Sequence, residues 1–125
     1  MRRVLLFAAT LAAAAWVLPA AAQDAVKADP KHYKVEFENA QVRVLRVTYG
    51  PGEKSVMHTH PANVAVFLNE SHGKFTLPDG KVIDATWKAG QTMWDPGSTH
   101  LPQNTGDKPF ELILVELKGR HKSAK

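Results

Sequence analysis

The amino-acid sequence predicts an all-β domain, either a sandwich or a barrel. After residue 22, apolar residues recur in short runs and not at the spacing of an amphipathic helix. These runs are rich in valine, threonine and aromatic residues, which favour strands. Glycine, proline and asparagine separate the runs at short intervals, as they do in sandwiches and barrels.

The predicted strands follow one another from residue 35 to residue 117. Turn residues mark their limits, and Pro78-Asp79-Gly80 is typical of a hairpin turn. Residues 64–68 and 112–115 are apolar on both faces, which predicts that another sheet or another subunit covers their outer side. The expected strands are 35–37, 42–49, 55–60, 64–68, 74–77, 81–87, 92–94, a strand that begins at His100, and 110–117.

Residues 1–22 have the composition of a secretory signal peptide. Arg2 and Arg3 supply a positive start, residues 4–18 are apolar apart from Thr10, and residues 20–22 are alanines that fit the cleavage pattern. The apolar stretch is shorter than the ~20 residues that a membrane span needs. We therefore expect cleavage before Gln23, a periplasmic or secreted protein, and no stable membrane insertion after cleavage.

The rest of the chain is expected to form one domain with two loose ends. Residues 23–34 are polar and predict a flexible lead-in, residues 35–117 predict the barrel, and residues 118–125 predict a basic tail. The formal net charge is only +4 and nothing resembles a nucleic-acid surface, so no nucleic-acid partner is expected. The chain has no cysteine, which excludes disulfides and a thiol nucleophile.

Three histidines predict a metal site. His58 and His60 are one residue apart in a predicted strand, so their side chains point to the same face. His100 begins a later strand that can face them. Neutral imidazole is the commonest side-chain ligand of transition metals, and three such ligands leave positions open for chemistry. We expect one divalent ion, either Fe, Mn, Ni, Cu or Zn.

The two histidine-bearing segments resemble the two motifs of the cupin superfamily. These motifs are G-x5-H-x-H-x3/4-E-x6-G and G-x5-P-x-G-x2-H-x3-N, and here the proline and glycine of the second are adjacent. The resemblance implies a double-stranded β-helix, the cupin jelly-roll barrel, with a metal inside its mouth. It also implies a homodimer formed through the outer sheet. The residues that carry it are Gly52, His58, His60, Gly90, Pro96, Gly97, His100 and Asn104.

The sequence departs from the cupin pattern at the carboxylate ligand. The motif's glutamate falls at Val64 in the most natural alignment, with Ala65 as the close alternative, and neither side chain binds metal. A site of three histidines carries no protein charge. It is therefore expected to hold iron or manganese less firmly than a site with a carboxylate does, and to retain good affinity for zinc, copper or nickel. The resemblance implies that such a site can still be catalytic, because thiol dioxygenases work with three histidines.

Other residues are assigned to the pocket or to the surface. His72 lies in a turn-like stretch and is expected to be exposed, whereas His32 and His121 are expected to lie in loose ends. Asn104 is expected to act mainly as a structural hydrogen-bonding residue. The residues assigned to the pocket are Val64, Phe67, Trp94 and Asn104.

The residue pattern favours metal-dependent chemistry if the protein is an enzyme. No covalent catalyst or phosphate-binding glycine loop is recognisable, and no catalytic residue can be assigned. The leading hypothesis is a periplasmic cupin that acts as a metal-dependent oxidase or dioxygenase on a small organic molecule. The alternative is a non-enzymatic module that binds a metal or a small ligand. A third hypothesis is a metal-free isomerase or epimerase, whose acid–base pair is not identifiable here.

Overall fold

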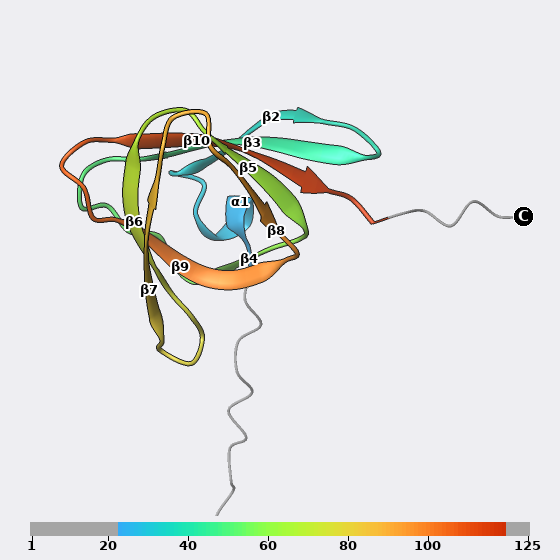
Figure 1. The fold of residues 1–125 in the computed structure, drawn as a ribbon. Coiled ribbons are helices and arrows are strands. Elements are labelled where there is room, and N and C mark those ends of the chain that lie inside the picture. The colour runs from blue at the N-terminus through green and yellow to red at the C-terminus, as the bar shows by residue number, and fades with distance from the viewer. Residues whose placement is uncertain (1–22, 120–125) are drawn as a thin grey trace, which may run out of the picture.

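The computed structural model describes residues 23–119 as ten strands and one helical turn (Figure 1). The predicted signal peptide and nearly all of the predicted basic tail therefore lie outside the described residues. The element bounds are β1 Gln23–Asp24, α1 Ala25–Ala28, β2 Tyr33–Glu38, β3 Val42–Tyr49, β4 His58–His60, β5 Asn63–Phe67, β6 Ser71–Thr76, β7 Val82–Trp87, β8 Thr92–Asp95, β9 Ser98–Asn104 and β10 Phe110–Leu117.

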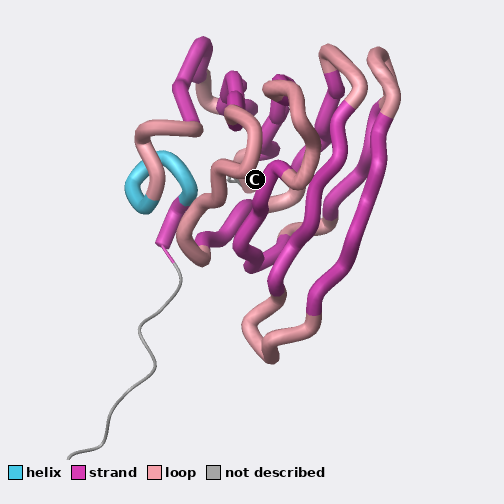
Figure 2. Tube along the Cα trace, turned by 90° about the vertical axis from the view of Figure 1, so that its left-hand side faces the viewer, coloured by secondary structure: helices cyan, strands magenta, loops and turns pink. Residues whose placement is uncertain are grey.

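Two five-stranded sheets form the barrel. One has the strand order β1-β4-β9-β6-β7 and the other has the order β2-β3-β10-β5-β8. All neighbouring strands are antiparallel except β1, which runs parallel to β4. Figure 2 shows how strands make up most of the described chain, with the helical turn beside its first residues. The predicted all-β class is confirmed.

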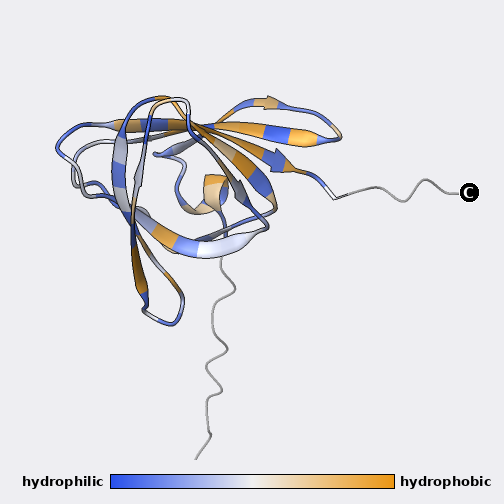
Figure 3. Cartoon of the chain, in the orientation of Figure 1, coloured by the Kyte–Doolittle hydropathy of each residue, from blue (hydrophilic) through white to orange (hydrophobic). Residues whose placement is uncertain are grey.

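The core lies between the sheets because alternate residues of each strand face inward. Buried residues alternate with less buried ones along β5, β10 and most of β3. Figure 3 shows apolar residues, in orange, on strands of both sheets. Phe67 of one sheet stacks on Trp87 of the other, with ring centroids 4.6 Å apart. This contact joins the two sheets. Within residues 23–119, no helix is long and apolar enough to cross a membrane.

Residues 23–34, which we expected to form a flexible lead-in, pack against the barrel. β1 pairs with β4, so that Gln23 lies opposite His58. The Asp24 carboxylate accepts a hydrogen bond from the backbone N–H of Val26 and caps α1. Ala25 is fully buried and Tyr33 almost so. The polar composition suggested a loose segment, but the polar side chains of Asp24, Asp29 and His32 form hydrogen bonds with the rest of the domain.

A β-bulge in β2 places an aromatic residue on the outer face of its sheet. The register shifts between Val35 and Phe37, and Phe37 lies opposite Val44. Phe37 is 55% exposed, and Trp94 at the far edge of the same sheet is 57% exposed. The strand register connects them through one continuous apolar row across the outer face. We call it the outer row, and its members are Phe37, Val44, Val115, Val64 and Trp94.

Candidate metal centre

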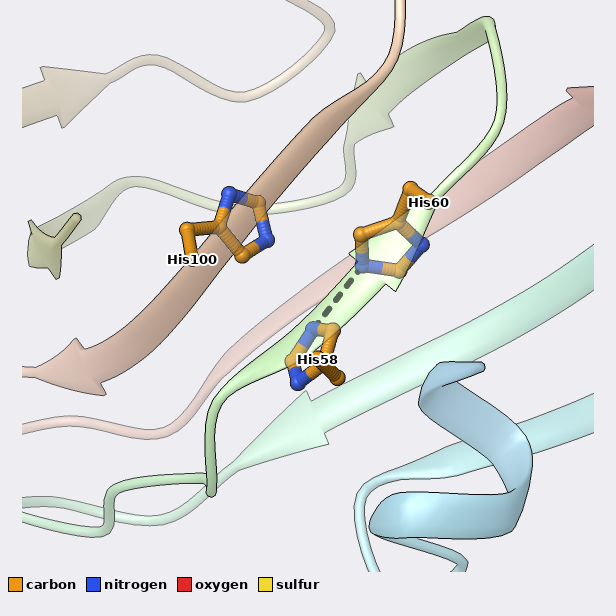
Figure 4. A group of neighbouring side chains, drawn as sticks. All are labelled: His58, His60 and His100. Atoms are coloured by element: carbon orange, nitrogen blue, oxygen red, sulfur yellow. Dashed lines mark hydrogen bonds between the residues drawn. The ribbon is translucent and has the colours of Figure 1, made fainter. Parts of the chain in front are cut away.

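Strands β4 and β9 bring the three predicted ligands together. His58 and His60 lie on the same face of β4, and His100 lies directly opposite His58 on β9. One nitrogen atom of each ring lies within 4.8 Å of the others. Figure 4 shows the three rings gathered over the two strands. His58 and His60 are buried and His100 is half-buried, so the cluster lies inside the barrel.

The His60 ring is fixed by a buried carboxylate. His60 Nδ1 lies 2.9 Å from Glu116 Oε1, and the Glu116 side chain is only 2% exposed. A carboxylate accepts hydrogen bonds, so Nδ1 carries the proton and Nε2 presents a lone pair. Arg43 Nε donates to the other Glu116 oxygen at 2.7 Å, and the Arg43 guanidinium also pairs with Asp24. These ion pairs offset the cost of burying the Glu116 charge.

The His58 ring is oriented by a carbonyl and a hydroxyl. His58 Nδ1 lies 2.8 Å from the backbone oxygen of Val56 and 3.2 Å from Ser55 Oγ. Ser55 Oγ in turn donates to Asp29 Oδ2 at 2.6 Å. Because the carbonyl can only accept, His58 Nδ1 donates, and its Nε2 also presents a lone pair.

The two Nε2 atoms face each other at 2.9 Å, the contact drawn as a dashed line in Figure 4. With both Nδ1 atoms donating outward, a hydrogen bond between them would require a second proton on one ring. Burial and the neighbouring His60 lower the pKa of His58 to about 4. Burial and both neighbouring histidines lower the pKa of His100 to about 3. A divalent cation fits here, because it satisfies converging ring nitrogens, two of which, on His58 and His100, burial keeps unprotonated.

A cavity opens beside the histidines and extends between the sheets. It holds about 550 Å³ of space, which includes solvent at its open end. His60 and His100 contribute to its wall, and Phe75 stacks on His100 with ring centroids 4.8 Å apart. The wall is otherwise mainly apolar. Its aromatic members are Tyr33, Tyr49, Phe67, Phe75, Trp87 and Phe110.

No family model and no curated protein matches this sequence. Solved structures match it over most of the described residues. A cupin domain from Bordetella pertussis Tohama I is 24% identical with a TM-score of 0.65, and the alignment covers 70% of this chain and 92% of that chain. The chain folds as a cupin. The predicted double-stranded β-helix is thereby confirmed.

Two further solved structures agree with the cupin fold. An uncharacterised protein with a double-stranded β-helix domain from Klebsiella pneumoniae is 24% identical, with a TM-score of 0.57 and coverage of 70% of this chain and 76% of that chain. An RmlC-like cupin family protein from Methanocaldococcus jannaschii is 18% identical, with a TM-score of 0.54 and coverage of 71% and 83%. At these identities the likeness concerns the fold.

Strand alternation in this fold separates the residues that we assigned to the pocket. Asn63, Ala65 and Phe67 face the cavity along β5, whereas Val64 points to the outer face. Trp94 lies opposite Val64 in the register and is exposed on that outer face. Phe67 therefore lines the pocket, but Val64 and Trp94 do not. Of the two positions that replace the motif's glutamate, Ala65 is the one that faces inward.

Asn104 takes the structural role that we expected and does not line the cavity. Its Nδ2 donates to the backbone oxygen atoms of Tyr49 at 3.1 Å and Lys108 at 2.8 Å, and its Oδ1 accepts from Gly106 N at 2.9 Å. These bonds hold the turn between β9 and β10. His72 is exposed as expected, and its ring contacts Glu70.

Sequence reasoning missed the polar residues that surround the cluster. Glu116 had a signal, because it occupies an inward position of β10 between apolar residues. Asp24, Asp29 and Ser55 had no such signal in the sequence, because they lie in segments too short or irregular to show the alternation of a strand. His32, which we expected in a loose end, is only 5% exposed and lies between the Asp29 and Glu53 carboxylates.

Proposed function

We propose that this cupin is a periplasmic or secreted protein that binds one divalent transition metal through His58, His60 and His100. We propose further that it acts as a metal-dependent oxidase or dioxygenase on a small organic molecule. The observation that carries the proposal is the convergence of three imidazole rings beside an apolar cavity, two of which, His60 and His100, form part of its wall. Imidazole nitrogens suit Zn, Cu, Fe and Ni, and the missing carboxylate disfavours Mn.

The residues around the site have separable roles in this proposal. A bound ion would supply Lewis-acid or redox chemistry at the positions that the histidines leave open. Glu116 keeps the proton of His60 on Nδ1, which leaves Nε2 as the ligand atom. The aromatic walls exclude water and fit a substrate with an apolar body.

The alternative, a non-enzymatic metal- or ligand-binding module, is supported by the hydrogen bonds that the carboxylate lining the cavity already accepts. Asp95 is among the residues that line the cavity, and its oxygens already accept hydrogen bonds from Ser98 Oγ at 2.6 Å and Gly97 N at 2.8 Å. Asn63 Nδ2 also donates to it at 3.3 Å. A carboxylate held in this way is poorly placed to act as a general base.

Elemental analysis tests the metal site directly. The chain without residues 1–22 is purified without a metal-binding tag and compared with His58→Ala and His72→Ala. We expect one equivalent of metal in the parent and in His72→Ala, whose exposed ring is a matched control, and loss of metal in His58→Ala. A parent protein that takes up no Zn, Cu, Ni, Fe or Mn on reconstitution would contradict the proposal.

Oxygen uptake separates the enzyme from the binding module. The metal-loaded protein is screened with small apolar-bodied acids, thiols and phenols in an oxygen electrode. Substrate-dependent uptake that disappears in His58→Ala supports the oxidase or dioxygenase. Stoichiometric metal binding without uptake favours the module.

A further inference from the structure

The first twelve described residues reach two of the three histidines, although they contain no ligand. We call residues 23–34 the N-terminal segment. One hydrogen-bond path starts at Asp29, which follows α1. Asp29 Oδ2 accepts from Ser55 Oγ at 2.6 Å, and Ser55 Oγ lies 3.2 Å from His58 Nδ1. His32 Nδ1 donates to the same Asp29 oxygen at 2.6 Å and keeps the carboxylate in place.

A second path starts at Asp24 and ends on His60. The Arg43 guanidinium pairs with the Asp24 carboxylate on one side and with Glu116 Oε2 at 2.6 Å on the other. Glu116 Oε1 lies 2.9 Å from His60 Nδ1. Arg43 and Glu116 belong to β3 and β10, so this path links the N-terminal segment to the opposite sheet.

Backbone and ring contacts add to these two paths. β1 is the strand that pairs with β4 on the side away from β9, with Gln23 opposite His58 and Asp24 opposite Thr59. The Tyr33 ring meets the His58 ring edge-on, with centroids 4.8 Å apart, and lies 5.4 Å from the His60 ring. The backbone and both rings of the His58–His60 strand are therefore held by the N-terminal segment.

His100 provides an internal contrast. Its nearest polar partner is Ser98 Oγ on its own strand, at 3.4 Å from Nδ1, and its ring stacks on Phe75 of β6. None of the contacts described for the N-terminal segment involves His100. Any effect of the segment on the site should therefore fall on His58 and His60 alone.

We propose that the N-terminal segment is a positioning part of the metal centre. Through Asp29 and Ser55 it adds a second acceptor to the Val56 carbonyl that holds the His58 ring, and through Asp24, Arg43 and Glu116 it fixes the ring orientation and tautomer of His60. The inference rests on the proposed metal binding. In this proposal, residues 23–34 contribute to the affinity for the ion as well as to the stability of the fold.

The test is a double-mutant cycle on the full mature chain. Zinc dissociation constants are measured by chelator competition for Ser55→Ala, Asp29→Ala, the double variant, and Asp84→Ala on exposed β7 as a control. We expect each single variant to weaken zinc binding about 10-fold or more, because partners behind a ligand have effects of that size. The double variant should bind zinc as tightly as the single variant with the larger effect, because both substitutions break the same path. Asp24→Ala tests the second path.

The tautomer of each histidine gives a readout that a merely structural role would not move. Ring ¹⁵N shifts are recorded for the metal-free proteins. We expect His58 to carry its proton on Nδ1 in the parent and to show a weaker preference for Nδ1 in Ser55→Ala, where the Val56 carbonyl remains as the other acceptor, with His100 unchanged in both. Ser55→Ala removes one oxygen and leaves the segment's sequence intact, so it decides the question if Asp29→Ala does not fold.

The possible failures are distinguishable. Unchanged zinc affinity in Ser55→Ala and in Asp24→Ala, together with an unchanged His58 tautomer in Ser55→Ala, would overturn this inference alone, even with a lower melting temperature. A parent protein that binds no zinc, copper, nickel, iron or manganese would overturn the proposed function and this inference with it.

Discussion

Glu116 shows how a single buried charge can hold a candidate metal-binding side chain, His60, in place. Its carboxylate joins the His60 ring to the Arg43 guanidinium and is almost fully buried. Removing the charge leaves Arg43 with one partner and frees the His60 tautomer. The orientation of His60 and the stability of the domain therefore depend on the same residue.

Glu116→Gln is expected to lower the free energy of unfolding by about 2–3 kcal/mol, in the range of lost hydrogen bonds to charged groups. It should also weaken metal binding about 10-fold or more, because a neutral amide holds the His60 N–H less firmly. Chemical denaturation and chelator competition measure the two effects. The control is Glu36→Gln, which alters an exposed ion pair with Arg46 and should cost less than about 1 kcal/mol. Equal effects for both variants would contradict the role given to Glu116.

The low pKa values of His58 and His100 predict how the metal-free protein responds to acid. Both values, about 4 and about 3, lie below the 6.5 of an unperturbed histidine, so the unfolded chain binds more protons than the folded one between these limits. Stability is therefore expected to fall as the pH drops from 6.5 toward 4. Denaturation midpoints at a series of pH values in the presence of chelator measure this slope. His100→Leu should reduce the slope. A slope unaffected by His100→Leu would contradict the assignment.

At the scale of elements, the two-residue alternation of strands decided which predictions succeeded. The strands of the barrel followed from apolar runs and turn residues, and the histidine cluster followed from the same alternation. Val64 was assigned to the pocket because the family's spacing was followed without knowing which β5 residues face inward. β1 and α1 have two and four residues. Segments this short show no period, and their order comes from tertiary contacts.

Ala65→Glu and Val64→Glu form a matched pair on β5. Ala65 faces the cavity that His60 and His100 line, so a glutamate there can supply the missing carboxylate and is expected to tighten Mn²⁺ or Fe²⁺ binding relative to zinc. Val64 faces outward, so Val64→Glu is expected to leave metal preference unchanged. Metal competition followed by elemental analysis measures the preference. A stronger effect from Val64→Glu would mean that β5 presents the other face to the site.

At the scale of the whole molecule, the outer row indicates that another protein surface covers this sheet. It runs across all five strands of one sheet and ends in two exposed aromatic residues, Phe37 and Trp94. Exposed apolar patches of this kind mark protein–protein contacts. A two-fold axis through Val115, near the middle of the row, would place the row against a copy of itself. We therefore propose a homodimer formed through this sheet.

Val115→Arg tests the homodimer. A charge in the middle of the outer row is expected to convert a dimer into a monomer, because the arginine would be buried without a partner. Light scattering coupled to size-exclusion chromatography measures the mass. Val82→Arg, at an exposed position of β7 in the other sheet, should leave the dimer intact. A monomeric parent protein at high concentration would contradict the proposal.

The walls of the cavity determine the order in which an ion meets the three rings. His60 and His100 line the cavity, but His58 lies behind them and is fully buried. An ion that entered through the cavity would therefore meet His60 and His100 before it reached His58. Loss of His58 would then leave the entry side of the site intact and remove the innermost of its three rings.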